Sequence, residues 1–346
     1  MKNVFSALLA ALMLAGMLAG CMNSSEVPKG SATAVPSQTE APAHTKISVV
    51  TTIFPEYDWV REILGDKADS AEITMLLDKG VDLHSYQPTA DDLIKISDCD
   101  LFVYVGGESD GWVDDALKNA TNKNRKVINL LDVLGDSVKT EEVVEGMQET
   151  EHDHDHDHDE DEDHEHEEEK DEHVWLSLKN AEVLVNAISK SLQELDPGNK
   201  DTYAINAAAY IEKLSALDGE YQAAVDAGTY QTLLFGDRFP FRYLVDDYGL
   251  SYYAAFVGCS AESEASFETV SFLARKVDEG KLPCVLTIEG KNHKIAETIV
   301  QNTAGKNQKI LTMDSMQSTT SQDVANGTTY LSLMAKNLDV LKEALG

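Results

Sequence analysis

Short apolar runs alternate with amphipathic segments along most of the chain, and this alternation is the main indication of the fold. A β-branched run at 46–53 is followed by a helical pattern at 56–64, and a second series begins near residue 232. Strands that alternate with helices are typical of a parallel sheet covered on both faces. The expected strands lie at 46–53, 71–76, 101–105, 126–130, 232–235, 251–257, 284–288 and 309–312. The expected helices lie at 56–64, 89–97, 112–120, 241–247, 267–279, 294–303 and 324–345.

Two further helical segments join the two series. The first, at 180–195, ends at Asp196-Pro197-Gly198, and the second, at 200–227, carries tyrosine and leucine at helical spacing. The second helix would run about 40 Å, enough to pass from one lobe to another. We therefore predict an α/β fold of two lobes, each a mostly parallel sheet flanked by helices, joined by a long rigid connecting helix. The expected boundaries are 46–198 for the N-terminal lobe, 199–227 for the connecting helix and 228–346 for the C-terminal lobe.

The first 45 residues have the composition of an export signal and a tether. Lys2 precedes an apolar stretch that is too short for a spanning helix, and small residues follow it. Leu18-Ala19-Gly20-Cys21 resembles the bacterial lipobox, which implies a lipoprotein signal peptide at 1–21 and a lipid on the sulfur of Cys21. Residues 22–45 are expected to form a flexible tether. We therefore expect an exported protein, lipid-anchored to the outer face of the bacterial cell membrane.

Seven of the ten histidines lie in one polar window at 151–173, together with fifteen acidic residues and one lysine. A segment without apolar residues cannot bury a core, so we expect a disordered loop at 141–172. Imidazole and carboxylate suit zinc and its neighbours, whereas acidic residues alone would be enough for solubility. We therefore interpret the loop as a metal-capture segment. Its expected ligands are His152, His154, His156, His158, His164 and His166.

The formal net charge of −33 argues against one class of partner. The polar window contributes −14 of this charge, from fifteen acidic residues and one lysine, and the rest of the chain is still acidic. Binding of nucleic acid needs a basic stripe that neutralises phosphates, and the sequence has none. Cations are the natural ligands of such a chain.

Three cysteines remain besides Cys21. Cys99 precedes an apolar run and is expected to be a buried free thiol. Cys259 and Cys284 both flank expected strands, and an exported protein permits a disulfide between them. The sequence leaves this pairing open, because it does not give the geometry that a disulfide requires.

Two histidines lie at the borders of expected secondary structure. His84 is in the stretch GVDLHSYQPT, a loop between an expected strand and a helix. Open α/β sheets bind ligands in loops at the carboxyl ends of their strands. His173 ends the polar window and precedes Val174-Trp175-Leu176, where ordered structure is expected to resume. Each histidine alone is more often a surface or capping residue, but together they can form a pair of zinc ligands.

Several stretches resemble one family. They are GVDLHSYQPT, the histidine-rich acidic insertion, EHVWLSLKNA, LDPGNKDTYAINAAAYIEKL and ILTMDS. In this order, over essentially all of 46–346, the chain is similar to the metal-binding lipoproteins of bacterial zinc and manganese ABC importers, the solute-binding proteins of cluster A-I. The resemblance implies a two-lobed protein, expected to be a monomer, that holds one divalent ion between its lobes for a membrane permease. It also implies His84, His173 and Asp314 as metal ligands.

The family's third ligand is missing at its usual place. It is usually a histidine or glutamate at the head of a His-x-x-Phe-x-Tyr pattern before Tyr248-Gly249-Leu250, and here that position is Arg238. A guanidinium stays protonated and has no lone pair for a metal. Asp237 is favoured as the replacement, with water or a different ligand as alternatives and Glu289 in reserve. Arg238 would then pair with an acid such as Glu289 or Glu264.

These observations favour capture of a divalent transition metal outside the cytoplasm and its delivery to an ABC permease. Zinc is favoured, because imidazole prefers the later first-row metals; the first alternative is the same fold delivering manganese or iron. A zinc hydrolase is less favoured, since the sequence contains no His-Glu-x-x-His and no Gly-x-Ser-x-Gly motif. A surface adhesin or metal buffer is the last alternative, which a lipid anchor by itself permits. No catalytic residue is expected.

Overall fold

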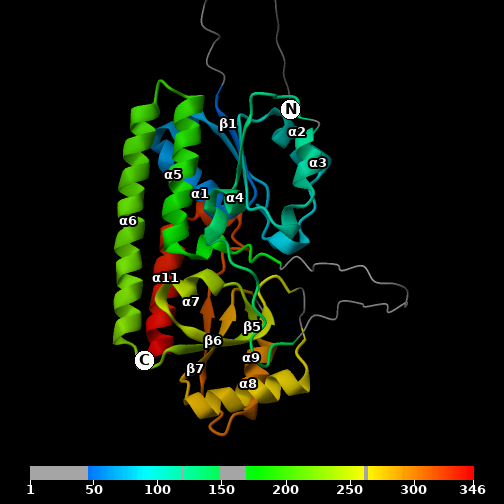
Figure 1. Ribbon diagram of the computed structural model, residues 1–346, viewed down its shortest axis with the longest axis vertical. Coiled ribbons are helices and arrows are strands. Elements are labelled where there is room, and N and C mark those ends of the chain that lie inside the picture. The colour runs from blue at the N-terminus through cyan, green and yellow to red at the C-terminus, as the bar shows by residue number, and fades with distance from the viewer. Residues whose placement is uncertain (1–45, 119, 149–168, 261–263, 291) are drawn as a thin grey trace, which may run out of the picture. The chain divides into compact units, whose positions relative to one another are not determined.

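The computed structural model describes residues 46–118, 120–148, 169–260, 264–290 and 292–346, and Lys46–Gly346 form one compact unit. Two parallel four-stranded sheets, each flanked by helices, make up this unit (Figure 1). None of the helices in the described ranges is both long and apolar enough to cross a membrane.

The N-terminal sheet has the strand order β2-β1-β3-β4. Its strands are β1 (Ser48–Thr51), β2 (Glu72–Met75), β3 (Leu101–Tyr104) and β4 (Lys126–Asn129). Its helices are α1 (Phe54–Leu64), α2 (Ala90–Asp98), α3 (Val113–Lys118) and α4 (Leu130–Leu134). Parallel strands need such crossover helices, and the carboxyl ends of all the strands therefore lie at one edge of the sheet.

The C-terminal sheet repeats this plan with the order β6-β5-β7-β8. Its strands are β5 (Thr232–Phe239), β6 (Ser251–Val257), β7 (Cys284–Ile288) and β8 (Lys309–Met313). The connecting helices are α7 (Arg242–Tyr248), α8 (Phe267–Gly280) and α9 (Lys294–Asn302). Pairing between β5 and β6 shifts register between Phe235 and Arg238, near the end of β5.

Two long helices follow the N-terminal sheet, α5 (Leu178–Leu195) and α6 (Lys200–Ala227). Along α6, buried residues recur every three or four positions from Tyr203 to Val225, and this stripe packs against helices of both halves, including α1, α5 and α7. Figure 1 shows α6 in light green beside α5 and the last helix. The prediction of two lobes joined by a long helix is confirmed.

The C-terminal helical segment differs from the expectation. Residues 324–345 were expected to form one helix, but the structure has α10 (Ser321–Ala325) and α11 (Tyr330–Leu345). Gly327 lies between them with φ +94°, a conformation that glycine adopts at no steric cost. Thr329 then caps α11, and Asp58 of α1 accepts the Tyr330 N–H at 2.9 Å, which fixes α11 to the N-terminal half.

Candidate metal centre

His84 lies after the carboxyl end of β2, in the short 3₁₀ helix η2 (Leu83–Ser85). Asp82 caps this helix, and its Oδ1 accepts the backbone N–H of His84 at 3.0 Å. The same oxygen lies 2.7 Å from Nδ1 of the His84 ring. The carboxylate therefore holds both the backbone and the imidazole of His84 in one orientation.

His173 has the same local geometry although it is far away in the sequence. It precedes the 3₁₀ helix η5 (Val174–Leu176), and Oδ1 of Asp171 accepts its backbone N–H at 2.8 Å. The same Asp171 oxygen lies 3.1 Å from Nδ1 of the ring, and the side chain of His173 is fully buried. The two imidazoles face one another with ring centroids 5.2 Å apart.

The paired carboxylates determine which ring nitrogen is available to a ligand. In both histidines Nδ1 faces an aspartate, which favours the tautomer with hydrogen on Nδ1 and a lone pair on Nε2. Nε2 of His84 and Nε2 of His173 are both buried, and neither has a hydrogen-bond partner within the described ranges. Two lone pairs thus point into one small space, as a metal site requires.

A glutamate that was not expected as a site residue lies beside these rings. Oε1 of Glu172 accepts the Ser109 N–H at 2.9 Å, from the 3₁₀ helix η3 (Glu108–Asp110) that follows β3. Oε2 lies 3.8 Å from Nε2 of His84, is buried, and finds no partner among the residues that the structure describes. The backbone at Gly107 passes so close that an added Cβ would stand 2.3 Å from the Glu172 carboxylate. Glu172 is therefore fixed with one free oxygen toward His84.

The C-terminal half contributes a cysteine to the same space. Cys259 follows β6, and one donor atom from each of His84, His173 and Cys259 lies within 4.8 Å of the others. Burial, followed by the nearby Glu141, Glu172 and Asp171, raises the pKa of the Cys259 thiol well above its usual range. The thiol is therefore neutral at ordinary pH.

The three cysteines within the described ranges are not paired. Cys99, Cys259 and Cys284 are all free thiols, so the possible disulfide between Cys259 and Cys284 is not present, and Cys99 is buried as expected. Burial raises the pKa of Cys99 to about 12. The sequence indicated only a possible disulfide for Cys259, and the position of this residue just after a strand was the one signal for a ligand-binding loop.

Arg238 spans the two halves of the centre. Its Nη2 lies 2.5 Å from Oδ2 of Asp82, and its Nη1 donates to the carbonyl oxygen of Ser260 at 3.3 Å. Burial alone would raise the pKa of Asp82, but the hydrogen bond from His84 and the charge of Arg238 hold it well below its usual range. The expectation that Arg238 pairs with Glu289 or Glu264 is wrong, because the carboxylate that Arg238 binds is Asp82. Asp82 in turn orients His84.

The acidic ligands expected from the sequence are not part of this group. Asp237 accepts the Arg238 N–H at 2.9 Å with Oδ1 and the Ile288 N–H at 3.3 Å with Oδ2. Oδ1 of Asp314 accepts the Met316 N–H at 2.8 Å. Glu289 accepts the Ser315 N–H at 2.6 Å and the Gln317 N–H at 3.2 Å, so it organises the loop after β8. The assignment of Asp237 and Asp314 as ligands stays a prediction that this geometry does not support.

Acidic side chains surround the opening of the centre. His84, Glu172 and Cys259 line a cavity of about 360 Å³. Its other lining residues are Glu108, Ser109, Glu141, Glu169, Lys170, Val257 and Ser260. Carboxylates around a concave site create a negative potential that concentrates cations.

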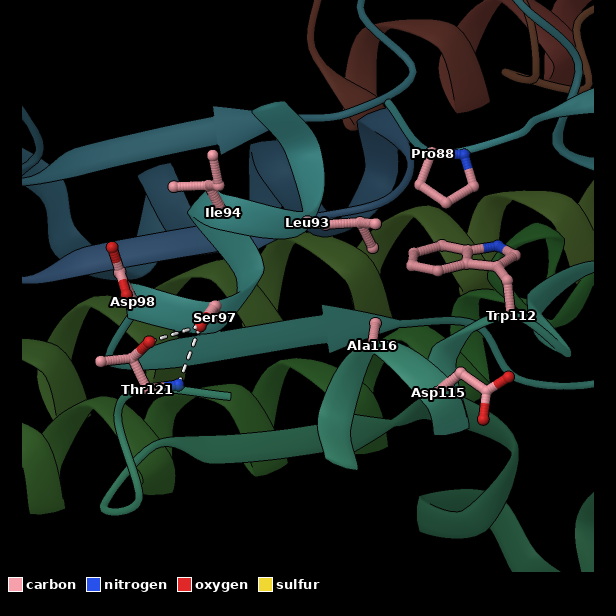
Figure 2. Close-up of a pocket in the computed structure, with 9 residues that line it drawn as sticks. All are labelled: Pro88, Leu93, Ile94, Ser97, Asp98, Trp112, Asp115, Ala116 and Thr121. Atoms are coloured by element: carbon pink, nitrogen blue, oxygen red, sulfur yellow. Dashed lines mark hydrogen bonds between the residues drawn. The ribbon is translucent and has the colours of Figure 1, made fainter. Parts of the chain in front are cut away.

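A larger cavity of about 620 Å³ lies between α2 and α3 and has different chemistry. Figure 2 shows Leu93 of α2 pointing toward Trp112, with Pro88 at one end, and Ile94 and Ala116 also line the cavity. Ser97 and Thr121 hydrogen-bond to each other across the opposite end. No histidine or cysteine is among its lining residues, so it is not the metal site.

Part of the sequence interpretation lies outside the described residues. This applies to the signal peptide, the tether, Cys21 and the six histidines from His152 to His166. The ends of the expected disordered loop are described, however, and they are ordered. Thr140 pairs with Lys170, the Gln148 N–H donates to the Ala255 carbonyl, and Glu172 is buried. The 141–172 expectation is therefore too wide, because both ends pack against folded structure.

Comparison with known proteins identifies the family. The model of the family described as zinc-uptake complex component A, periplasmic (ZnuA), matches residues 49–344. The chain belongs to the ZnuA family. This ZnuA family member is 31% identical over 329 residues to the high-affinity zinc uptake system protein ZnuA of Bacillus subtilis, covering 95% of this chain and 94% of that protein.

Other ZnuA family relatives support the same assignment. The chain is 32% identical over 301 residues to zinc-binding lipoprotein AdcA of Streptococcus pneumoniae, covering 87% of this chain but only 56% of AdcA. The chain thus spans just over half the length of AdcA. The crystal structure of the Zn(II)-bound ZnuA-like domain of that AdcA matches with a TM-score of 0.66 and 30% identity, over 87% of this chain and 99% of that one. The predicted family and fold are confirmed.

Proposed function

We propose that this ZnuA family member captures a divalent transition metal, zinc in the first place, outside the cytoplasm and delivers it to an ABC permease. One observation carries the proposal: Nε2 of His84 and Nε2 of His173 are buried beside each other with no partner within the described ranges. A buried polar atom without a hydrogen bond costs about 1–3 kcal/mol. A metal ion that binds both lone pairs removes this cost.

Each residue around the two rings has a separate role in capture. His84 and His173 bind the ion through Nε2, while Asp82 and Asp171 hold the hydrogen on Nδ1 and so keep each lone pair directed at the ion. Glu172 offers its free oxygen beside His84 and can neutralise part of the cation's charge. The acidic rim attracts the cation before it reaches the rings.

The donor set favours zinc over manganese. Imidazole suits zinc, copper and iron, whereas an oxygen-rich set suits manganese. The family is described as a zinc-uptake component, and the printed names of its AdcA and ZnuA relatives refer to zinc. Delivery of manganese or iron by the same fold is the alternative, and competition between the metals separates these possibilities.

Delivery requires a membrane partner and a fixed location. We infer that Cys21 carries a lipid and that the chain acts as an anchored monomer on the outer face of the membrane; AdcA, which is named a lipoprotein, supports this. The family description as an uptake component supports a transport role over hydrolysis. A role as an adhesin or metal buffer is less favoured for the same reason.

Zinc competition against a strong chelator tests the proposal on the full chain, because weak sites do not retain metal under these conditions. We expect one retained zinc in the wild-type protein and in His293→Ala, which changes a histidine outside the group. We expect none in His84→Ala. Equal zinc retention by wild type and His84→Ala would overturn the proposal.

A further inference from the structure

The loop that follows β6 is built against the imidazole of His173. A Cβ added to Gly258 would stand 2.9 Å from Cε1 and 3.1 Å from Nδ1 of the ring, so only glycine fits here without a shift. The carbonyl oxygen of Phe239 would lie 3.0 Å from the same added Cβ. The next residue is Cys259, and this close backbone approach is what brings its side chain to the two histidines.

Hydrogen bonds from both halves hold this loop. The Cys259 N–H donates to Oε1 of Glu141 at 2.9 Å, and the Ser260 N–H donates to the Val257 carbonyl at 3.3 Å. Arg238 donates to the Ser260 carbonyl with one nitrogen and to Asp82, the partner of His84, with another. The thiol-bearing loop and the ring of His84 are therefore fixed by the same guanidinium.

A second, independent observation points to a ligand at the same place. His173 is fully buried and Glu172 is 2% exposed, yet Nε2 of the first and Oε2 of the second lack partners among the described residues. Two histidines and Cys259 place their donor atoms within 4.8 Å of one another, and the Glu172 carboxylate oxygen lies 3.8 Å from Nε2 of His84. Nitrogen, sulfur and oxygen are the donors that zinc sites use.

We propose that Cys259 is a metal ligand, so that the ion is held by His84, His173 and the Cys259 sulfur, with Glu172 as the fourth donor. This inference rests on the proposed function. On binding, the S–H bond of Cys259 breaks, a metal–sulfur bond forms, and the proton leaves to solvent through the acid-lined cavity, with no change of oxidation state. A thiolate is a soft ligand and disfavours manganese, so Cys259 also sets the choice of metal.

Cobalt(II) is the probe that tests the sulfur ligand on the full chain, because a bound thiolate gives a near-ultraviolet sulfur-to-cobalt charge-transfer band. Histidine and carboxylate do not give this band, so other cobalt sites on the chain do not interfere. We expect the band in the wild-type protein and in Cys284→Ser, a matched control that changes a buried thiol of β7. We expect it to be absent in Cys259→Ser.

Two further measurements complete the test. Cys259→Ser should lower the zinc-over-manganese preference by at least about tenfold, since an oxygen replaces the sulfur. In the wild-type protein, bound zinc should protect Cys259 from alkylation, as read by mass spectrometry, which needs no variant. Tight one-to-one cobalt binding without the charge-transfer band overturns the cysteine ligand but leaves the proposed function intact. Absence of any tight site overturns both.

Discussion

The two halves of the candidate metal centre differ in whether their imidazoles and carboxylates have hydrogen-bond partners. In the N-terminal half, His84, Glu172 and His173 each have a buried atom with no partner within the described ranges. In the C-terminal half, the carboxylates of Asp237 and Glu289 already have partners. Each of them accepts a backbone N–H with each of its two oxygens. The comparison teaches that being acidic and near the centre is not enough: a ligand must also be oriented by neighbours that leave its lone pair free.

The largest expected effect is in the N-terminal half. His173→Ala removes a fully buried proposed ligand whose Nδ1 is already held by Asp171. We expect the zinc affinity to fall by more than the roughly 10–100-fold that the loss of a supporting partner causes. Titration calorimetry with chelator competition measures the change, and an affinity within tenfold of the wild type would contradict the comparison.

Glu56 sharpens the comparison between the two halves. It lies outside the group around His84, yet one of its buried carboxyl oxygens has no hydrogen-bond partner within the described ranges. Oε2 accepts the Thr52 N–H at 2.8 Å, while Oε1 has no partner among the described residues. Burial, and then the charge of Asp110, raises the pKa of Glu56 from 4.5 to about 8. Glu56 is therefore neutral at neutral pH.

This raised pKa predicts the sign of a pH dependence. The folded state keeps a proton that the unfolded state loses above about pH 4.5, so the stabilisation is complete below that value and is lost as the pH rises through about 8. We expect Tm to fall by several degrees from about pH 6 to about pH 9, at ~2 °C per kcal/mol. Glu56→Gln should flatten this decline, whereas Glu62→Gln on the same helix should not. A parallel decline in Glu56→Gln and wild type would refute the assignment.

Arg238 tests whether a residue of the C-terminal half positions His84 through Asp82. Arg238→Gln removes the charge that holds Asp82 and the bond that holds the Ser260 carbonyl. We expect a roughly 10–100-fold loss of zinc affinity, with the one-to-one stoichiometry retained. Arg275→Gln, which changes an exposed side chain of α8, is the control. If Arg238→Gln leaves the zinc affinity unchanged, the contact of Arg238 with Asp82 does not contribute to metal binding by His84.

The two histidines and the cysteine differ in how far the sequence could reveal them. His84 and His173 are the only residues of the chain in an Asp-x-His pattern, which allows one carboxylate to hold both the backbone N–H and the ring. No histidine between 152 and 166 has this pattern. Local spacing therefore distinguishes His84 and His173 from the other six histidines of the polar window.

Cys259 could not be predicted as a site residue in this way. Its place depends on the close approach of Gly258 to His173 and on the contact of Arg238 with Asp82, two residues that are 156 positions apart. Such contacts form only when the two sheets are in place. The alternation of strands and helices was readable because it follows local periodicity, whereas the break at Gly327 was missed because one glycine in an amphipathic run is a weak signal.

A smaller effect is expected for the acids that the sequence favoured. Asp237→Ala removes two backbone hydrogen bonds but no atom of the group around His84, and Asp314→Asn keeps an oxygen for the Met316 N–H. We expect zinc affinities within about tenfold of the wild type, below the effect of Arg238→Gln. A loss of zinc affinity as large as that of His173→Ala would show that Asp237 or Asp314 is a ligand. The contrast between carboxylates with and without hydrogen-bond partners would then be wrong.

The smallest effect on the tight site is expected from removal of residues 149–168. The deletion has to end before Glu169, whose carbonyl accepts the Glu141 N–H at 2.8 Å, because Asp171 and Glu172 just beyond it belong to the centre. The histidine-rich and acidic composition of the removed segment predicts several weak metal equivalents, because imidazole and carboxylate suit zinc. Metal content at saturation should therefore drop while the affinity of the tight site stays the same.

A variant of full length with asparagine at the six histidines from His152 to His166 is the control for chain length. Loss of the tight site in both variants would mean that the segment itself holds the metal and that the His84–His173 pair does not.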